Sequence, residues 1–324
     1  MKVHRDINNL PPFQKAVVTI GTFDGVHTGH HQILLQMKAE SKRINGETVI
    51  ITFHPHPRMV INNKTSGAAH DIQLLNTLDE KILLLEKQQI DHLVVVNFTK
   101  DFADQPAEDY IKNFLVARFR PEIVIIGYDH RFGKNRAGDY KLLEKFQTPL
   151  GYEVKEIPEQ VLNNAVISST RIRKALLSGN IDVAKEALGY DYFFEGTVVE
   201  GNKIGRELGY PTANIKMNEE NKLIPCDGIY AVEAELIESN SEPLLSTQKK
   251  LKGMMSIGLR PTIGNSERTI EVNIFDFDQD IYGHTLRVFM RSYLRPEVKF
   301  ETLDDLKTQI DLDKIAAEDV LHIS

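Results

Sequence analysis

The alternation of short apolar runs with helical periodicity in the first half of the chain limits its fold most strongly. Apolar runs rich in β-branched residues lie at 16–20, 48–53, 93–96 and 123–126. Helical patterns stand between them, at 29–44, 78–89 and 106–119. Strands that are apolar on both sides and separated by helices are typical of a parallel sheet covered by helices. We therefore expect an α/β, Rossmann-like domain with a parallel sheet.

The pattern changes near residue 190. Short β runs then follow at 193–199, 229–236, 270–277 and 286–290, separated by Gly, Pro and polar turns. This spacing predicts an antiparallel β-barrel or sandwich. A terminal helix is expected from about Leu303, where Thr302 and Asp305 resemble a capping box, and a polar surface loop is expected at 239–252. We place the domain boundary after residue 188, which gives domains 1–188 and 189–324.

Composition and charge limit the classes of partner. The chain has 324 residues, enough for two domains, and a formal net charge of −7, which argues against non-specific binding of nucleic acid. Cys226 is the only cysteine, as is typical of a reducing compartment, and no apolar run resembles a leader or a membrane span. We expect a cytoplasmic protein, a monomer or weak homo-oligomer, that acts on small molecules without nucleic acid or membrane partners.

Three polar segments follow three of the expected strands. They lie at 21–30, 54–58 and 127–138. Because ligands bind outside the carboxyl ends of strands in an open α/β sheet, we expect these segments to converge on one crevice.

The segment 21–30, GTFDGVHTGH, joins an expected strand to an expected helix. His27 and His30 are three residues apart, so one helical turn places them on one face, where ring N–H groups can bind phosphate oxygens. Glycines at 21, 25 and 29 allow close approach of a ligand, and the helix N-terminus favours an anion. The alternative is a glycine-rich turn with two surface histidines.

Two further segments of the first half offer polar groups. Ser168 or Ser169 is expected to cap a helix, whose first-turn N–H groups, with Thr170 and Arg173, form a second anion site. A plain capped helix with solvated arginines is the alternative. Together with His27 and His30, the histidines of the HPHP sequence at 54–57 could suggest a metal cluster, but the prolines favour a rigid wall instead.

The second half has its own glycine-rich segment, at 201–214. Gly201, Gly205 and Gly209 permit a loop whose N–H groups cradle phosphates. Thr212 and Asn214 share a face if they lie on a strand, and their oxygens are suitable ligands for Mg²⁺. Glu271 lies in the alternating run 269–274 and can accept a proton from a hydroxyl, unless it is an ordinary solvent-facing residue.

The motifs of the first half resemble those of HxGH nucleotidyltransferases, and specifically the FMN adenylyltransferase domain of prokaryotic bifunctional riboflavin kinase/FAD synthetases. The segments 52–57 and 127–133 also resemble blocks of that family, although His130 stands where an aromatic residue is expected. The resemblance implies that the FMN phosphate attacks the α-phosphorus of ATP with the aid of Mg²⁺, and that His27 and His30 hold phosphates. It also implies ATP- or phosphate-binding roles for Gly21, Phe23, Asp24, Gly29, Asp129, Ser168, Ser169, Thr170 and Arg173.

The segments of the second half resemble the riboflavin kinase domain, which implies a six-stranded Greek-key barrel with a terminal helix. Carried over, Glu271 activates the riboflavin 5′-hydroxyl, and Thr212 and Asn214 ligate Mg²⁺ and ATP phosphates. Gly201, Gly205 and Gly209 belong to a loop over the nucleotide. We therefore expect a chain that uses ATP to convert riboflavin to FMN and FMN to FAD.

Two other functions are compatible with parts of the sequence. The HxGH chemistry alone would also fit a nucleotidyltransferase for another phosphorylated metabolite, which the kinase-like second half disfavours. A non-catalytic flavin sensor would bind flavin without ATP turnover, which Glu271, His27 and His30 disfavour.

Overall fold

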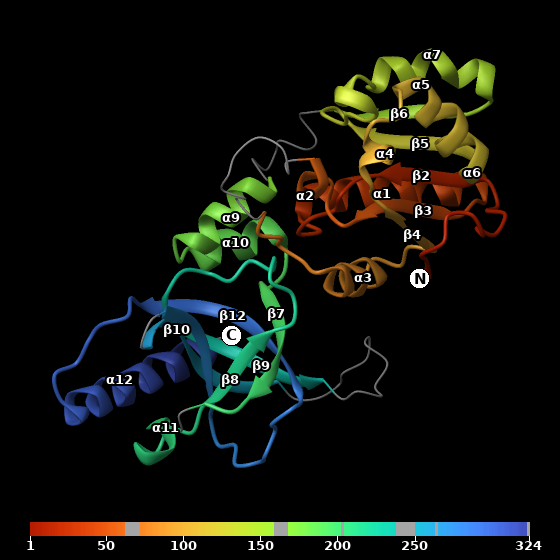
Figure 1. Ribbon diagram of the computed structural model, residues 1–324. Helices are drawn as coiled ribbons and strands as arrows, with labels where there is room; N and C mark the ends of the chain where they lie inside the picture. The colour runs from red at the N-terminus through yellow and green to blue at the C-terminus, as the bar shows by residue number, and fades with distance from the viewer. Residues whose placement is uncertain (62–71, 159–167, 202–203, 238–249, 263–264, 323–324) are drawn as a thin grey trace. The chain divides into compact units, whose positions relative to one another are not determined.

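The computed structural model describes residues 1–61, 72–158, 168–201, 204–237, 250–262 and 265–322. The chain forms two compact units that divide between Ser169 and Thr170 (Figure 1). The sequence placed the boundary after residue 188. The difference is the helical pair α9 (Ser169–Leu177) and α10 (Ile181–Leu188), which joins the second unit by its contacts.

The first unit is a six-stranded parallel sheet with helices on its faces (Figure 1). Its strands are β1 (Lys2–His4), β2 (Ala16–Ile20), β3 (Thr48–His54), β4 (His92–Asn97), β5 (Pro121–Gly127) and β6 (Glu153–Ile157). Its helices are α1 (Thr28–Ile44), α2 (Pro57–Ile61), α3 (Leu78–Glu86), α4 (Lys100–Ala103), α5 (Ala107–Asp109), the π-helix η1 (Tyr110–Val116), α6 (Ala117–Phe119), the 3₁₀ turn η2 (Lys134–Arg136) and α7 (Tyr140–Leu150). The Rossmann-like α/β prediction is confirmed.

The strand order, β1-β4-β3-β2-β5-β6, explains where a ligand can bind. From β2 the chain adds β3 and β4 on one side and then returns to add β5 on the other, so the order reverses between β2 and β5. In open α/β sheets this switch point is where a crevice opens at the carboxyl ends of the strands. The predicted polar segments after β2, β3 and β5 do lie at that edge.

The β-branched content of these strands reflects burial on both faces. All five residues of β2 are buried, as are the first five of β3. One face packs against η1 and α7, where Ile111, Phe114 and Leu143 meet alternate residues of the strands. The helix α1 contacts β2, β3 and β5. The glycine-bearing segment between β2 and α1 is thus fixed at both ends by core elements.

The second unit is a closed antiparallel barrel, β10-β11-β8-β7-β12-β9. Its strands are β7 (Phe193–Val199), β8 (Ala213–Met217), β9 (Gly228–Ile237), β10 (Leu251–Thr262), β11 (Asn265–Ile274) and β12 (Thr285–Arg295), with the short helix α11 (Ile204–Glu207) between β7 and β8. The strands β9, β10 and β11 form successive antiparallel pairs, and β12 returns beside β9. This is a Greek key, as the resemblance implied.

The terminal helix α12 (Leu303–His322) packs against the barrel through Ala317 and Leu321. Arg295 donates two hydrogen bonds to the Asp313 carboxylate, 2.7 and 2.6 Å long, and ties the end of β12 to this helix. Thr302 Oγ1 accepts the N–H of Asp305 at 3.1 Å, which is half of the expected capping box. The Asp305 carboxylate accepts from the Thr302 hydroxyl rather than from its backbone, because Asp is shorter than Glu.

Several element predictions were incomplete or wrong. The sequence analysis did not identify β1, β6, β8 or β10. The strand expected at 270–277 ends at Ile274 because Asp276 has a φ of 53°, which a strand does not tolerate. The polar loop expected at 239–252 falls largely outside the described residues, and Leu251 and Lys252 belong to β10.

Candidate functional site

The switch point of the parallel sheet carries the loop between β2 and α1. Two of its non-glycine residues, Phe23 and Val26, have φ values of 47° and 35°, in the left-handed region. Gly25, with a φ of 90°, turns the chain between them. The Phe23 ring lies over Gly21, where a Cβ atom would come within 3.2 Å of it. The loop is therefore a strained, tightly packed turn rather than an open surface segment.

The predicted histidine pair meets on this turn. His27 is the N-cap of α1, and its Nδ1 lies 3.4 Å from the N–H of His30. The two rings stack with centroids 3.8 Å apart and planes 17° apart. Because Nδ1 of His27 accepts this hydrogen bond, the proton of the neutral ring lies on Nε2, which can donate to a ligand. His30 Nδ1 is buried and has no hydrogen-bond partner within the described ranges. The pair can therefore offer hydrogen-bonding groups to a ligand.

Burial keeps these imidazoles neutral. Desolvation lowers the pKa of His27 to about 4, with Asp24 opposing the shift. Desolvation likewise holds the pKa of His30 well below 6.5, and the neighbouring His27, Lys81 and His31 lower it further. A bound polyphosphate would favour the charged form of both rings, because an opposite charge nearby raises the pKa of a histidine. The two imidazoles can therefore take up protons, and so gain positive charge, when an anion binds.

Asp24 and Ser169 join two motifs that are 145 residues apart in the sequence. The buried Asp24 carboxylate accepts the N–H of Leu75 at 2.9 Å, and its carbonyl accepts the Ser169 hydroxyl at 2.9 Å. Asp24 thus holds the turn in place, and a direct contact with nucleotide stays a prediction. The same bond brings Ser169 to the His27 turn.

The other predicted residues of this site lie on separate elements. Gly29 is buried in the first turn of α1. Asp129 is exposed on the turn after β5, where its charge opposes the burial that lowers the pKa of His130 to about 4. Ser168 precedes α9, and Thr170 and Arg173 lie in its first turns, beyond the division between the two units. Their roles stay predictions.

The barrel brings Glu271 and the Thr212 segment together. The strands β8 and β11 pair so that Asn214 lies opposite Glu271. The Thr212 hydroxyl donates to Glu271 Oε2 at 3.2 Å, and Asn273 Nδ2 donates to the carbonyl of Pro211 at 2.7 Å. Glu271 and Asn273 therefore share one face of β11, as the alternation predicted. Thr212 itself lies just before β8, so only Asn214 is a strand residue.

The three glycines of the segment 201–214 are each required for a different structural reason. The Asn214 side chain lies against Gly201, where a Cβ atom would come within 2.1 Å of Nδ2. A Cβ atom at Gly205 would meet the Tyr210 carbonyl at 2.4 Å, and Gly209 has a φ of 86°. The helix α11 lies within the expected loop, between Gly201 and Gly209. The glycines allow this segment to fold closely onto Thr212 and Asn214.

Comparison with known proteins accounts for both halves of the chain. Residues 11–171 match the FAD synthetase family model and residues 188–321 match the riboflavin kinase family model. The bifunctional riboflavin kinase/FMN adenylyltransferase of Buchnera aphidicola subsp. Schizaphis graminum is 37% identical over 97% of this chain and 96% of its own. The enzyme of the same name from Escherichia coli K12 is 34% identical over 100% and 99%.

The chain belongs to the bifunctional riboflavin kinase/FMN adenylyltransferase family. The chain is also similar to a crystal structure described as a macrolide-efflux protein from Streptococcus pneumoniae, with a TM-score of 0.84, 28% identity and coverage of 98% of both chains. The two family models leave most of the α9–α10 helical pair between them. The functional boundary at 188 stays a prediction.

The barrel brings together oxygen-bearing side chains of the kind predicted to hold Mg²⁺. The Thr212 hydroxyl lies 3.2 Å from a Glu271 carboxylate oxygen and Asn214 lies opposite Glu271 on the paired strand, and a hard cation prefers oxygen ligands. Across the described residues, no group of three or more His, Cys, Asp or Glu is placed to hold a metal. In the HPHP segment, His56 Nδ1 accepts the N–H of Arg58 at 3.2 Å and so supports its own turn.

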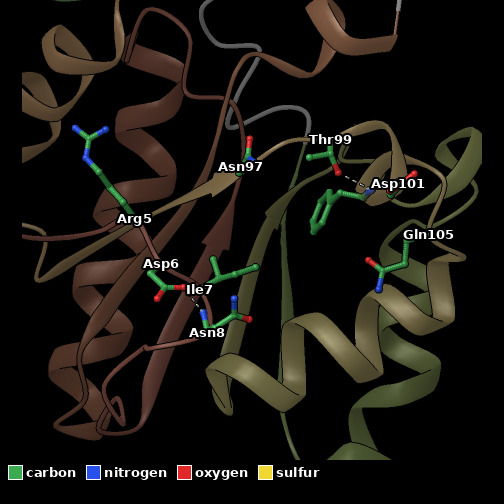
Figure 2. A pocket seen from close by; sticks show the side chains of 9 residues that line it. Arg5, Asp6, Ile7, Asn8, Asn97, Thr99, Asp101 and Gln105 are labelled. Atoms are coloured by element: carbon green, nitrogen blue, oxygen red, sulfur yellow. Dashed lines mark hydrogen bonds between the residues drawn. The ribbon is translucent and has the colours of Figure 1, made fainter.

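An open cavity of about 560 Å³ lies at the carboxyl ends of β1 and β4 (Figure 2). Arg5, Asn97, Asp101 and Gln105 contribute polar groups to it, and Phe102 contributes an aromatic ring. None of the residues predicted from the sequence lines it. We give it no role in the site, because it shares no residue with the His27 turn. No helix in the described part of the chain is both long and apolar enough to cross a membrane.

Sequence reasoning missed three residues that support the two sites. Lys81 lies beneath the His27 turn, Asn273 holds Pro211, and the Tyr210 hydroxyl donates to Asp311 on α12. Lys81 lies in a helical pattern, where lysine normally indicates an exposed position. Only the strand alternation at 269–274 gave a signal, since it placed Asn273 on the same face as Glu271.

Proposed function

We propose that this protein phosphorylates riboflavin to FMN in its barrel and transfers an adenylyl group from ATP to FMN in its α/β unit, yielding FAD and pyrophosphate. The observation that supports the proposal is that the chain holds two separate groups of predicted site residues, each brought together within its own unit. One is the stacked His27–His30 pair at the switch point, and the other is the Glu271–Thr212 pair of the barrel. The full-length similarity to bifunctional relatives supports both.

In the adenylyl transfer, an oxygen of the FMN phosphate attacks the α-phosphorus of ATP. A new P–O bond forms, the bond between the α-phosphorus and its bridging oxygen breaks, and pyrophosphate leaves. In our proposal His27 and His30 hold phosphate oxygens and gain positive charge as they do so. The start of α9, with Ser168, Ser169, Thr170 and Arg173, receives the departing pyrophosphate. Catalysis then consists of positioning and charge stabilisation.

In the kinase reaction, the riboflavin 5′-hydroxyl attacks the γ-phosphorus of ATP and ADP leaves. We assign Glu271 as the group that accepts the hydroxyl proton. The hydrogen bond from Thr212 holds its carboxylate in place. Mg²⁺, when bound, neutralises phosphate charge, and Thr212 and Asn214 would hold it. The segment with Gly201, Gly205 and Gly209 lies beside these residues and would cover the nucleotide.

A product analysis tests the proposal. The purified protein is incubated with riboflavin, ATP and Mg²⁺, and flavins are separated by chromatography over time. FMN is expected first and FAD afterwards, and FMN supplied directly is expected to yield FAD. Absence of FMN would reject the kinase half, whereas FMN without FAD would reject the adenylyltransferase half. A cytoplasmic location, a monomeric or weakly associated state and the absence of nucleic acid partners are further parts of this proposal.

A further inference from the structure

A buried lysine contacts the His27 turn from below, and the reaction assigned above gives it no part. Lys81 is 6% exposed, on α3. Its ammonium donates to the carbonyl of Thr22 at 2.6 Å and to the Thr52 hydroxyl at 3.4 Å. The Thr52 hydroxyl in turn donates to the same carbonyl at 3.2 Å. Lys81 thus links α3, β3 and the turn that carries the histidines.

The turn needs such anchors because its backbone is strained. Phe23 and Val26 have left-handed φ values, which cost free energy for residues with bulky side chains, and Val26 is also β-branched. Conformations of this kind persist only where the surroundings fix them, and they occur preferentially at functional sites. Leu75 and Ser169 fix Asp24, and Lys81 fixes the peptide before Phe23.

The Lys81 contact also determines the direction of a backbone donor. In a trans peptide the carbonyl and the N–H point in opposite directions. Because the Thr22 carbonyl points to Lys81, the N–H of Phe23 points away from Lys81. Backbone N–H groups in a glycine-bearing turn before a helix are typical phosphate-binding groups. Lys81 can therefore set the orientation of a group that a phosphate would use.

The charge of Lys81 is costly where it lies. Burial lowers its pKa to about 8, and the nearby Asp24 opposes the shift. An apolar side chain would fill the space without that desolvation cost, so stability alone does not explain an ammonium here. A buried cation next to a site for polyphosphate is better explained by function.

We propose that Lys81, in its charged form, is a positioning residue for adenylyl transfer: it fixes the turn at 22–24 and supplies positive charge beneath the phosphates of ATP. This inference rests on the proposed function. It assigns Lys81 no contact with substrate and no step in the transfer.

The first test replaces Lys81 by methionine, with Lys87→Met as the matched control, since Lys87 is exposed at the other end of α3. Lys81→Met is expected to lower the rate of FAD formation from FMN about 10²-fold, because small misplacement of bound phosphates has effects of that size. FMN formation from riboflavin in the same preparation should be unchanged, as should both activities of Lys87→Met. FAD formation by Lys81→Met within threefold of wild type would overturn the proposal.

The second test uses the natural protein and so does not depend on a variant that folds. We expect kcat/KM for ATP in adenylyl transfer to fall as pH rises through about 8, as the free enzyme loses the Lys81 proton. Among the described residues, the other titratable groups that interact with Lys81 are Asp24 and His30. His30, like the neighbouring His27, has a pKa below 6.5. Lys81→Arg, which stays charged, is expected to remove the fall. A profile that is flat from pH 7 to about 10 in the wild type would contradict the proposal.

These results separate failure of the inference from failure of the proposed function. A wild-type protein that makes no FAD from FMN would reject the proposed function itself. A wild-type protein that makes FAD, with a flat pH profile or an active Lys81→Met variant, would reject only the role of Lys81. Circular dichroism and limited proteolysis show whether Lys81→Met folds, and if it does not, the wild-type pH profile decides.

Discussion

The two sites of this protein are held together by different means. In the α/β unit, the histidines lie on one continuous turn, and its strained backbone is held by groups from distant segments such as Leu75, Ser169 and Lys81. In the barrel, Glu271 and Asn214 face each other across two hydrogen-bonded strands, so the sheet register itself positions them. The first site therefore depends on many tertiary anchors, whereas the second depends on strand pairing.

Substitutions of the proposed catalytic residues test whether the two sites act separately. Glu271→Gln removes the proton acceptor and is expected to lower FMN formation about 10³-fold, while conversion of FMN to FAD is retained. The combined change His27→Ala and His30→Ala is expected to lower FAD formation about 10²- to 10³-fold and to leave FMN formation intact. Both rates are measured by chromatography. If either variant lost both activities equally, the comparison between two independent sites would be wrong.

A smaller effect is expected at Asn273, which supports the barrel site without belonging to it. Asn273→Ala removes the hydrogen bond from the buried Asn273 amide to the Pro211 carbonyl. One such bond corresponds to about 1 kcal/mol, so kcat/KM for riboflavin phosphorylation should fall about fivefold to tenfold. The exposed Asn218→Ala variant, in which only a bond from Thr197 is lost, is the control. An unchanged kinase rate in Asn273→Ala would show that strand register alone is sufficient.

The buried histidine predicts how the stability of the α/β unit depends on pH. The folded-state pKa of His27 is about 4 and its unfolded value is about 6.5, so the unfolded chain binds more protons between these values. The free energy of unfolding should therefore fall as pH falls from about 6.5 to 4, by on the order of 3 kcal/mol from this group. His27→Ala should reduce the dependence, and the exposed His54→Ala should not. The free energy of unfolding is measured with denaturant at each pH. If it depended on pH equally in both variants, the burial of His27 would be contradicted.

The smallest effect concerns the terminal helix. Thr302→Ala removes the hydroxyl that accepts the N–H of Asp305 and should destabilise the barrel by about 1 kcal/mol. Thr308→Ala, which also removes an exposed threonine hydroxyl, is the matched control because Thr308 lies beyond the first turn of α12. Urea unfolding followed by loss of riboflavin kinase activity measures the difference. FAD formation from FMN should be the same in both variants.

The sequence predicted contiguous features well because local patterns carry them. The β-branched runs identified β2 through β5, and the GTFDGVHTGH segment brought His27 and His30 together as expected. Short or edge strands such as β1 and β6 were missed because their few residues lack an apolar run. The strand β8 was anticipated only as a possible position of Thr212 and Asn214, because the glycine-rich segment before it was the stronger signal.

The anchors of the sites could not be predicted for a different reason. The contacts of Lys81 with Thr22 and of Ser169 with Asp24 join residues 59 and 145 positions apart, and no periodicity encodes them. The burial of Lys81 depends on how α3 packs against the sheet, which one sequence does not specify. The anchors of the α/β site were thus the least predictable part, and the paired strands of the barrel site were easier to anticipate.

If the two sites are independent, one chain binds two nucleotides at the same time. Calorimetric titration with a non-hydrolysable ATP analogue and Mg²⁺ measures the number of sites directly. We expect two analogue molecules per wild-type chain and one in the variant that combines His27→Ala with His30→Ala. A stoichiometry of one in the wild-type protein, under conditions where it makes both FMN and FAD, would contradict the account.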